Sequence, residues 1–128
     1  MKTYFGLGLA MLAGSVLGAA AVTGLNAQAK PPAYTVSEVD VTNPDGFTKE
    51  YLPLLRASMK NSGAKLLAGS EKVTLIEGSS VPKRVAIQEW ESMDKFLAWR
   101  NSADAKAARE IGNKYATSHS YAIEGLPK

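Results

Sequence analysis

A run without any charged residue, from Tyr4 to Leu25, constrains this chain more than any other feature. One lysine precedes the run, and the small-x-small tripeptide Ala27-Gln28-Ala29 follows it. A basic start, an apolar centre and such a tripeptide are together typical of a secretory signal. We therefore predict a signal peptide over residues 1–29, cleavage after Ala29, and export by the Sec route to a periplasmic or secreted location.

An uncleaved membrane anchor is the alternative for this segment, since about 20 apolar residues suffice to span a bilayer. Five glycines between Gly6 and Gly24 weaken a helix there, and the tripeptide offers a cleavage site. We therefore expect membrane contact only before cleavage. The remaining residues suffice for one domain, which we divide into a leader at 30–32, a domain at 33–125 and a tail at 126–128.

Composition argues against several classes of function. The chain has no cysteine, which excludes thiol catalysis, disulfides and thiolate metal sites. Its 15 basic and 12 acidic residues are scattered, and no basic stripe interleaves with aromatics, so we expect no binding to nucleic acid. A single histidine cannot assemble a metal site, and the sequence has no glycine-rich phosphate loop. We expect no metal and no cofactor.

The first half of the mature chain has the pattern of a strand followed by a helix. Ala33 to Val41 alternates with period two and is rich in β-branched and aromatic residues. Asn43-Pro44 is typical of a helix start, because asparagine caps and proline suits the first position. An apolar stripe at spacings of four follows, formed by Phe47, Tyr51, Leu55 and Met59. Pro53 inside the stripe predicts a kink or a split, and Gly63 predicts a left-handed end.

The second half predicts two more strands, an interrupted helix and a last strand. Ala64 to Glu77 reads as one long strand with a bulge or bend at Gly69-Ser70, and Arg84 to Trp90 is the clearest strand in the chain. The remaining elements are two helical segments that begin at Ser92 and Ser102 and a strand from His119 to Ile123. This order predicts a ferredoxin-like βαββαβ fold of the α+β class, with one four-stranded antiparallel sheet and two helices on one face.

Four motifs resemble the domain of unknown function 1330 family. They are the segment from Tyr34 onward, Val41-Thr42-Asn43-Pro44-Asp45, Arg84-Val85-Ala86-Ile87-Gln88-Glu89-Trp90-Glu91-Ser92 and Ala122-Ile123-Glu124-Gly125. The resemblance covers about residues 33–125, with the motifs in the family's order. It implies a ferredoxin-like domain of the dimeric α/β barrel type, and therefore a homodimer. It implies no activity, because the family's biochemical role is unassigned.

Two positions depart from the family's pattern. Ala103-Asp104-Ala105-Lys106 stands where the family usually has Pro-Glu-Tyr-Gln, and Gly112 stands where we would align an arginine. If those family residues line a pocket, the pocket of this protein is altered. Arg109, one turn before Gly112, is the residue that could replace the arginine.

Five residues are candidates for a functional site. His119 is the only histidine and the candidate catalytic base, since imidazole titrates near neutral pH. Its alternative role is that of a half-buried strand residue. The candidates for ligand binding are Trp90, Glu89, Tyr51 and Ser102. Aromatic side chains at this spacing also suit a core, so both interpretations remain open for Trp90 and Tyr51.

The face of the sheet away from the helices also needs a cover. Tyr34 and Val36 of the first strand, together with Trp90 or Ile87 of the third, make that face too apolar to leave in water. We therefore predict a homodimer that buries it.

Two functions fit these observations. The first is a noncatalytic exported homodimer that binds a small apolar or aromatic molecule, which the lack of a catalytic motif favours. The alternative is a cofactor-independent small enzyme, an oxygenase or isomerase of the dimeric α/β barrel type, acting through His119 and Trp90. Along the sequence His119 has only neutral neighbours, from Thr117 to Tyr121, and this favours binding over catalysis. A weaker third option is a subunit or regulator for a partner in the cell envelope.

Overall fold

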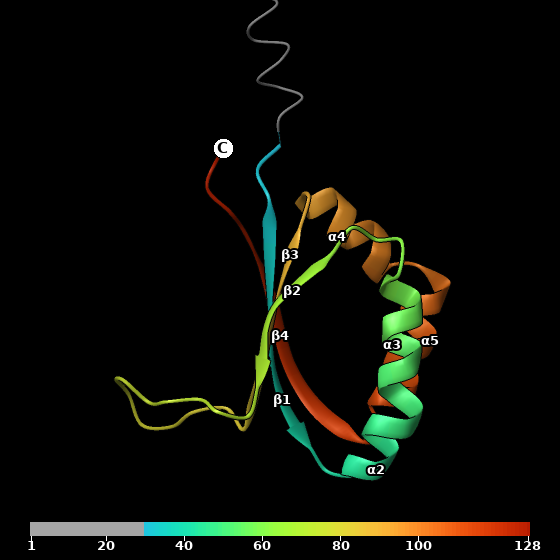
Figure 1. The fold of residues 1–128 in the computed structure, drawn as a ribbon, viewed down its shortest axis with the longest axis vertical. Helices are drawn as coiled ribbons and strands as arrows, with labels where there is room; N and C mark the ends of the chain where they lie inside the picture. The colour runs from blue at the N-terminus through green and yellow to red at the C-terminus, as the bar shows by residue number, and fades with distance from the viewer. Residues whose placement is uncertain (1–29) are drawn as a thin grey trace, which may run out of the picture. The chain divides into compact units, whose positions relative to one another are not determined.

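Four strands form one antiparallel sheet in the computed structural model, which describes residues 30–128 (Figure 1). The strands are β1 (Ala33–Val41), β2 (Lys65–Ser70), β3 (Arg84–Trp90) and β4 (Ala116–Glu124). Their order across the sheet is β2-β3-β1-β4, so β1 and β3 lie in the centre. The predicted signal peptide, residues 1–29, lies outside the described residues.

Helices cover one face of this sheet (Figure 1). The first helical segment follows β1 and consists of α2 (Pro44–Gly46), η1 (Phe47–Tyr51) and α3 (Leu52–Met59). The second follows β3 and consists of α4 (Met93–Arg100) and α5 (Ala103–Gly112). This chain order and this strand arrangement confirm the predicted ferredoxin-like α+β fold.

Pairing between strands decides which side chains face the helices. Ala33 lies opposite Trp90, and Ser37 lies opposite Ser120. Residues that are paired in this way point to the same side of a sheet, and Trp90 contacts the helices. We call the other side the open face. It comprises Tyr34, Val36, Glu38 and Asp40 of β1, Lys65, Ala68 and Ser70 of β2, Val85, Ile87 and Glu89 of β3, and Thr117, His119, Tyr121 and Ile123 of β4.

The helices begin where the sequence predicts. Asn43 Oδ1 accepts a hydrogen bond from the Gly46 N–H at 3.1 Å. Ser92 and Ser102 cap α4 and α5 in the same way, each accepting from the N–H three residues later at 3.2 Å. These bonds satisfy backbone donors that have no partner within the helix.

Pro53 does not break the first helical segment. Instead, the turn before it widens into η1, a π-helical turn closed by a bond from the Leu52 N–H to the Phe47 carbonyl. A proline ring presses on the carbonyl four residues earlier and removes one N–H from the helix. A wider turn accommodates both effects. The predicted left-handed end at Gly63 is wrong as a helix cap, because α3 ends at Met59 with Lys60 as its right-handed C-cap. Gly63 lies in the loop that follows and has a φ of 79°.

The predicted long strand from Ala64 to Glu77 is wrong in its second half. β2 ends at Ser70, and its bulge lies between Leu66 and Ala68 rather than at Gly69-Ser70. A strand needs hydrogen bonds from a neighbour to extend. The ladder with β3 ends where Ser70 meets the second residue of that strand, so the chain beyond it has no partner in the sheet.

Residues 71–83, which we call the arm, leave the sheet at this point. The arm extends on the side away from the helices (Figure 1). Its segment Val73-Thr74-Leu75-Ile76 contains good strand formers, yet Ile76 is 96% exposed. Intrinsic preference for the strand therefore does not decide the structure here, because pairing and packing are what stabilise a sheet.

Trp90 is fully buried and faces the helices. Its ring lies 5.2 Å from that of Phe96 and 5.1 Å from that of Trp99, both on α4. Its indole N–H donates to Thr35 Oγ1 at 3.3 Å. The option that Trp90 lies on the open face is therefore wrong, because the pairing register places it on the other side of the sheet.

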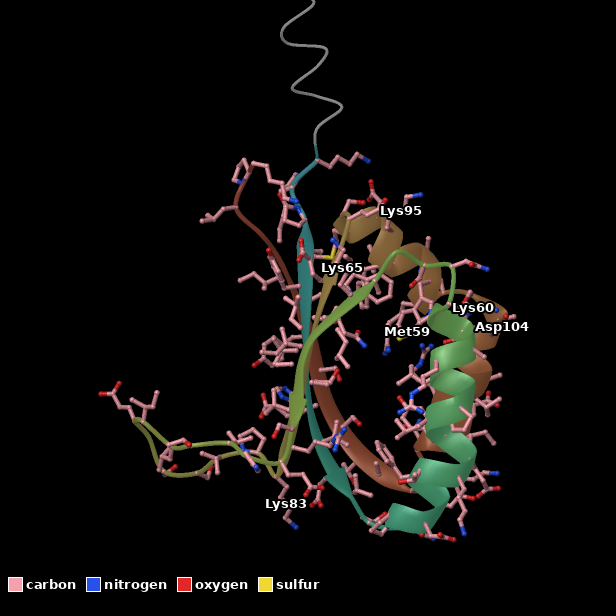
Figure 2. The ribbon with its side chains drawn as sticks, viewed as in Figure 1. Met59, Lys60, Lys65, Lys83, Lys95 and Asp104 are labelled. Atoms are coloured by element: carbon pink, nitrogen blue, oxygen red, sulfur yellow. The ribbon has the colours of Figure 1, made fainter. Side chains whose placement is uncertain are left out.

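The first helical segment reaches the sheet at the end that carries Trp90. Figure 2 shows Met59 extending from α3 toward the sheet, and Gln88 Nε2 lies 3.6 Å from the sulfur of Met59. The Trp99 indole N–H donates to Ser58 Oγ at 3.2 Å, which ties α4 to α3. Within the described residues, no buried side-chain nitrogen or oxygen lacks a hydrogen-bond partner.

Phe47→Ala should lower the free energy of unfolding by about 3–5 kcal/mol, the usual cost of removing a buried aromatic ring. Phe47 is 7% exposed, and its ring centre lies 5.1 Å from that of Tyr51. Leu54→Ala is the matched control on the same helical segment, and because Leu54 is 45% exposed it should cost about 1 kcal/mol or less. Denaturant unfolding measures both variants. Equal losses would show that Phe47 is not part of the core.

Candidate functional site

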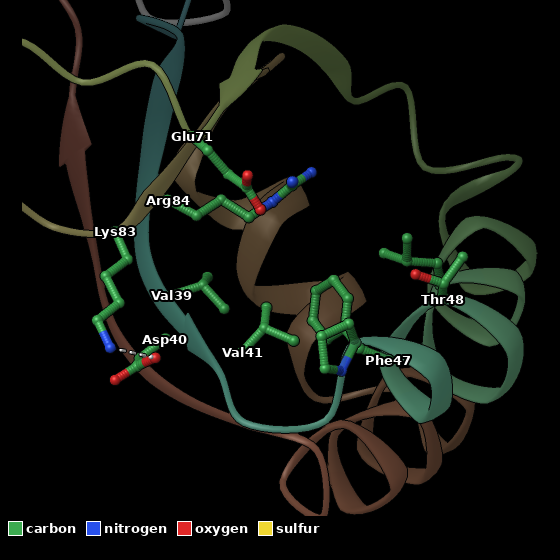
Figure 3. Close-up of a pocket in the computed structure, with 10 residues that line it drawn as sticks. Val39, Asp40, Val41, Phe47, Thr48, Glu71, Lys83 and Arg84 are labelled. Atoms are coloured by element: carbon green, nitrogen blue, oxygen red, sulfur yellow. Dashed lines mark ion pairs between the residues drawn. The ribbon is translucent and has the colours of Figure 1, made fainter.

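A pocket of about 380 Å³ opens between the end of β1 and the first helical segment (Figure 3). Its lining comes from β1, the first helical segment, the arm and the start of β3. The lining residues are Val39, Asp40, Val41, Pro44, Phe47, Thr48, Leu52, Glu71, Lys83 and Arg84. The pocket therefore lies where the chain turns back over the sheet.

One wall of the pocket is apolar. Val39 and Val41 both face the helices, because alternate residues of a strand share a face. The helix start at Asn43-Pro44 turns the chain back directly after β1. This turn brings Phe47 into the same wall as the two valines (Figure 3). One short stretch of sequence therefore builds the apolar wall.

The other side of the pocket carries charge. Arg84 lies opposite Val39 in the ladder between β1 and β3, and so points to the helix side. Glu71, the first residue of the arm, extends toward Arg84 (Figure 3). Lys83 Nζ lies 3.3 Å from Asp40 Oδ1, but both side chains are largely exposed, so this ion pair adds little stability. Arg84 offers only donors to a bound molecule, and the Glu71 carboxylate offers acceptors.

Small side chains cover the middle of the sheet on the helix side. Ser37 and Ala86 face the helices there, and Ser120 Oγ donates to Ser37 Oγ at 3.1 Å. Ser118 and Ser120 are exposed to solvent although they lie on the side that the helices cover. Solvent therefore reaches the helix side of the edge strand β4.

Tyr51 lies between the first helical segment and α5. A Cβ atom at Gly112 would come within 2.6 Å of Tyr51 Cε1, so the absence of a side chain there makes room for the ring. Burial raises the pKa of Tyr51, and the positive charges of Arg109 and Arg100 partly offset this rise. Arg109 therefore brings a positive charge near Tyr51.

The structure does not bring the predicted ligand-binding residues together. Trp90 is fully buried, and Glu89 lies on the open face. The Ser102 hydroxyl caps α5 and so has a structural role. Of these candidates Tyr51 is the one that contacts the pocket lining, because its ring packs against Phe47.

His119 lies on the open face, on the opposite side of the sheet from Trp90. Its Nδ1 is 3.4 Å from Oε2 of Glu38, which lies directly across on β1. The ring of Tyr121 lies 5.6 Å away, and partial burial together with the Glu38 carboxylate raises the pKa of Tyr121. The neutral sequence neighbours of His119 therefore do not describe its surroundings, and His119 and Trp90 cannot act in one site.

Sequence reasoning missed the pocket as a site. Part of its signal is local, because strand alternation places Val39 and Val41 on one face and the helix start returns Phe47 above them. The approach of Glu71 to Arg84 has no local signal, since it depends on where the arm leaves the sheet. The acid beside His119 is likewise visible only after β1 and β4 are paired.

Two further properties concern only the described part of the chain. None of the helices in residues 30–128 has the length and apolar character needed to cross a membrane. Among these same residues, no three histidine, aspartate or glutamate side chains gather where they could hold a metal ion.

Solved structures with the same fold come from several bacteria. A protein of unknown function from Rhodopseudomonas palustris is 16% identical with a TM-score of 0.57, and the match covers 84% of this chain and 93% of that one. SnoaB, a cofactor-independent oxygenase from Streptomyces nogalater, is 14% identical with a TM-score of 0.55 over 77% of this chain and 96% of that one. A dimeric ferredoxin-like protein of unknown function from Thermobifida fusca is 14% identical with a TM-score of 0.50 over 73% and 92%.

At these identities the structural likeness shows the fold alone. None of the curated proteins matches this chain. The model of the family described as "Domain of unknown function (DUF1330)" matches residues 32–126, which include all four strands and every helix described above. The chain therefore belongs to the DUF1330 family.

Proposed function

We propose that this domain binds a small, largely apolar or aromatic molecule in the pocket beside Phe47, without transforming it. The observation that carries this proposal is the arrangement of one apolar wall, Val39, Val41 and Phe47, with one guanidinium, Arg84, directed to the same space. The volume of about 380 Å³ falls within the usual range of small-molecule sites. The geometry favours an apolar body that ends in a carboxylate or carbonyl group, because Arg84 can only donate.

The one histidine of the chain does not line the pocket, which supports binding over catalysis. His119 lies on the other side of the sheet from the pocket wall, because its partner Glu38 and the wall residue Val39 are consecutive on β1. Consecutive strand residues point to opposite faces. A molecule in the pocket therefore does not meet the imidazole of its own subunit.

A homodimer that covers the open face is part of the proposal. Val36 and Ile87 lie side by side on this face, Tyr121 is 49% exposed and Ile123 is 61% exposed. A contiguous apolar patch of this kind marks an interaction surface. A solved structure with this fold is described as dimeric, which supports the same arrangement here.

A cofactor-independent enzyme is the second candidate, and the pairing of His119 with Glu38 favours it. A carboxylate at 3.4 Å from Nδ1 can orient an imidazole as a general base. SnoaB, which shares the fold, is described as a cofactor-independent oxygenase, and this is an analogy of fold only. In this case the substrate would lie on the open face, where the pair is located, and not in the pocket.

Export of the mature domain completes the proposal. The basic start, the uncharged run and the tripeptide that ends at Ala29 support a periplasmic or secreted location. Intact-mass measurement of protein recovered from the cell envelope should show a chain that begins at Lys30. A chain that still begins at Met1 in the membrane fraction would instead identify a retained anchor.

Arg84→Met should weaken the binding of octanoate about tenfold or more and leave the binding of 1-octanol nearly unchanged, because only the carboxylate gains a charge-assisted bond. Calorimetry and thermal shift on the mature protein measure both ligands. Arg56→Met is the matched control, since Arg56 is an exposed arginine of α3 outside the pocket lining. Val39→Phe should abolish both interactions by filling the pocket. Unchanged binding of both ligands by Val39→Phe would contradict the pocket assignment.

Light scattering at micromolar concentration should show a dimer. Ile87→Glu should convert it to a monomer, because the substitution places a charge inside the apolar patch of the open face. Leu54→Glu is the control, since Leu54 is an exposed apolar residue of α3. A monomeric wild-type protein would refute the dimer.

Wild-type protein should consume neither oxygen nor any compound from a panel of aromatic acids and fatty acids. An oxygen electrode and chromatography measure both. If the wild type converts a compound, and the rate falls about 10²–10⁴-fold in both His119→Gln and Glu38→Gln, the protein is an enzyme rather than a binding protein. Circular dichroism of the two variants serves as the control for folding.

A further inference from the structure

The arm, residues 71–83, extends from the sheet on the side of the open face (Figures 1 and 2). Three of its apolar side chains are exposed, namely Leu75 at 47%, Ile76 at 96% and Val81 at 41%. Lys83 at its base lies 3.3 Å from Asp40, and Gly78, at a φ of 107°, permits the turn. The arm therefore presents apolar groups away from its own domain.

Arm and open face are directed to the same side of the molecule. Single exposed apolar residues are ordinary on a protein surface, but contiguous ones mark a site of interaction. The open face contributes Val36, Ile87, Tyr121 and Ile123 to such a patch. One partner seated on the open face can cover both the patch and the arm.

The open face and the arm together offer surface to a partner. Four strands about 4.8 Å apart, with an average length of about eight residues at about 3.3 Å per residue, give a flat area of roughly 500 Å². A stable interface usually buries about 800 Å² on each partner. The side chains of the face add to this flat area, and the arm supplies further surface on the same side.

We propose that the arm of each subunit clasps a second copy of this chain that is seated on the open face, an inference that rests on the homodimer proposed above. Under twofold symmetry each copy gives one arm and receives one, since an isologous interface uses the same surfaces twice. The receiving surface is β4 of the partner subunit, through the partner's Tyr121 and the partner's Ile123. Both residues are exposed in the single chain.

Removal of the apolar side chains from the arm tests this proposal. In the mature chain, Leu75→Ser combined with Ile76→Ser should raise the dimer dissociation constant about 100-fold or more, as two large apolar groups lose their burial. Sedimentation velocity over a dilution series measures the constant. The matched control is Leu54→Ser combined with Leu97→Ser, which removes two leucines that are each 45% exposed on helices, and it should leave the constant unchanged.

The outcomes separate this proposal from the one on which it rests. A wild-type protein that is monomeric at all concentrations would refute the homodimer and the clasp together. The clasp alone would be refuted if Ile87→Glu dissociated the dimer while the double arm variant kept the dissociation constant of the wild type. Weakening of the dimer by the arm variant and not by the helix control supports the clasp.

A crosslink identifies the surface that receives the arm. Because the chain has no cysteine, Ile76→Cys creates one attachment point for a benzophenone maleimide. Mixed dimers of ¹⁴N- and ¹⁵N-labelled subunits then distinguish links between subunits from links within one. Links from the arm to the partner's peptide that contains Tyr121 and Ile123 support the proposal. Links within one subunit only, or links to the partner's helices, would overturn it.

Discussion

Pairing of β1 with both of its neighbours is the constraint on which the rest of this structure depends. β1 lies between β3 and β4, so its register fixes which residues of three strands share a face. A shift of one residue would exchange the two faces of the strand. In the observed register Val39 and Val41 lie in one wall with Phe47, whereas Glu38 meets His119 on the other side. The pocket and the carboxylate–imidazole pair both depend on this register.

Contacts at the two ends of the sheet hold the helices in place. At one end Trp90 packs against α4 and shares a hydrogen-bonded network with Thr35 and Gln88, which matters because an unpaired buried polar group costs about 1–3 kcal/mol. At the other end Phe47, which is 7% exposed, lies in the pocket wall with Val39 and Val41 of β1. Between these ends the helix side of the sheet carries small serine and alanine side chains, among them Ser37 and Ala86.

The sheet separates two kinds of chemistry. Its helix side offers an apolar pocket with a guanidinium, and its open face offers the only imidazole of the chain beside a carboxylate. Binding and catalysis would therefore use different surfaces. A second copy seated on the open face would also enclose His119. Membership of the DUF1330 family fixes the fold without deciding between these uses, so the choice depends on the side chains of each face.

The sequence by itself determined the order of the elements, the starts of the helices and the alternation of each strand. These features depend on residues a few positions apart, as when Asn43 caps the N–H of Gly46. Only the tertiary structure decided that Val73-Thr74-Leu75-Ile76 belongs to an arm, that Trp90 faces the helices and that Glu71 approaches Arg84. It also placed Glu38 against His119, 81 positions away in the sequence. The local sequence pattern shows that a strand has two faces. Which face the helices cover depends on strands that meet only when the chain folds. The same pairing decides which acid lies beside the histidine.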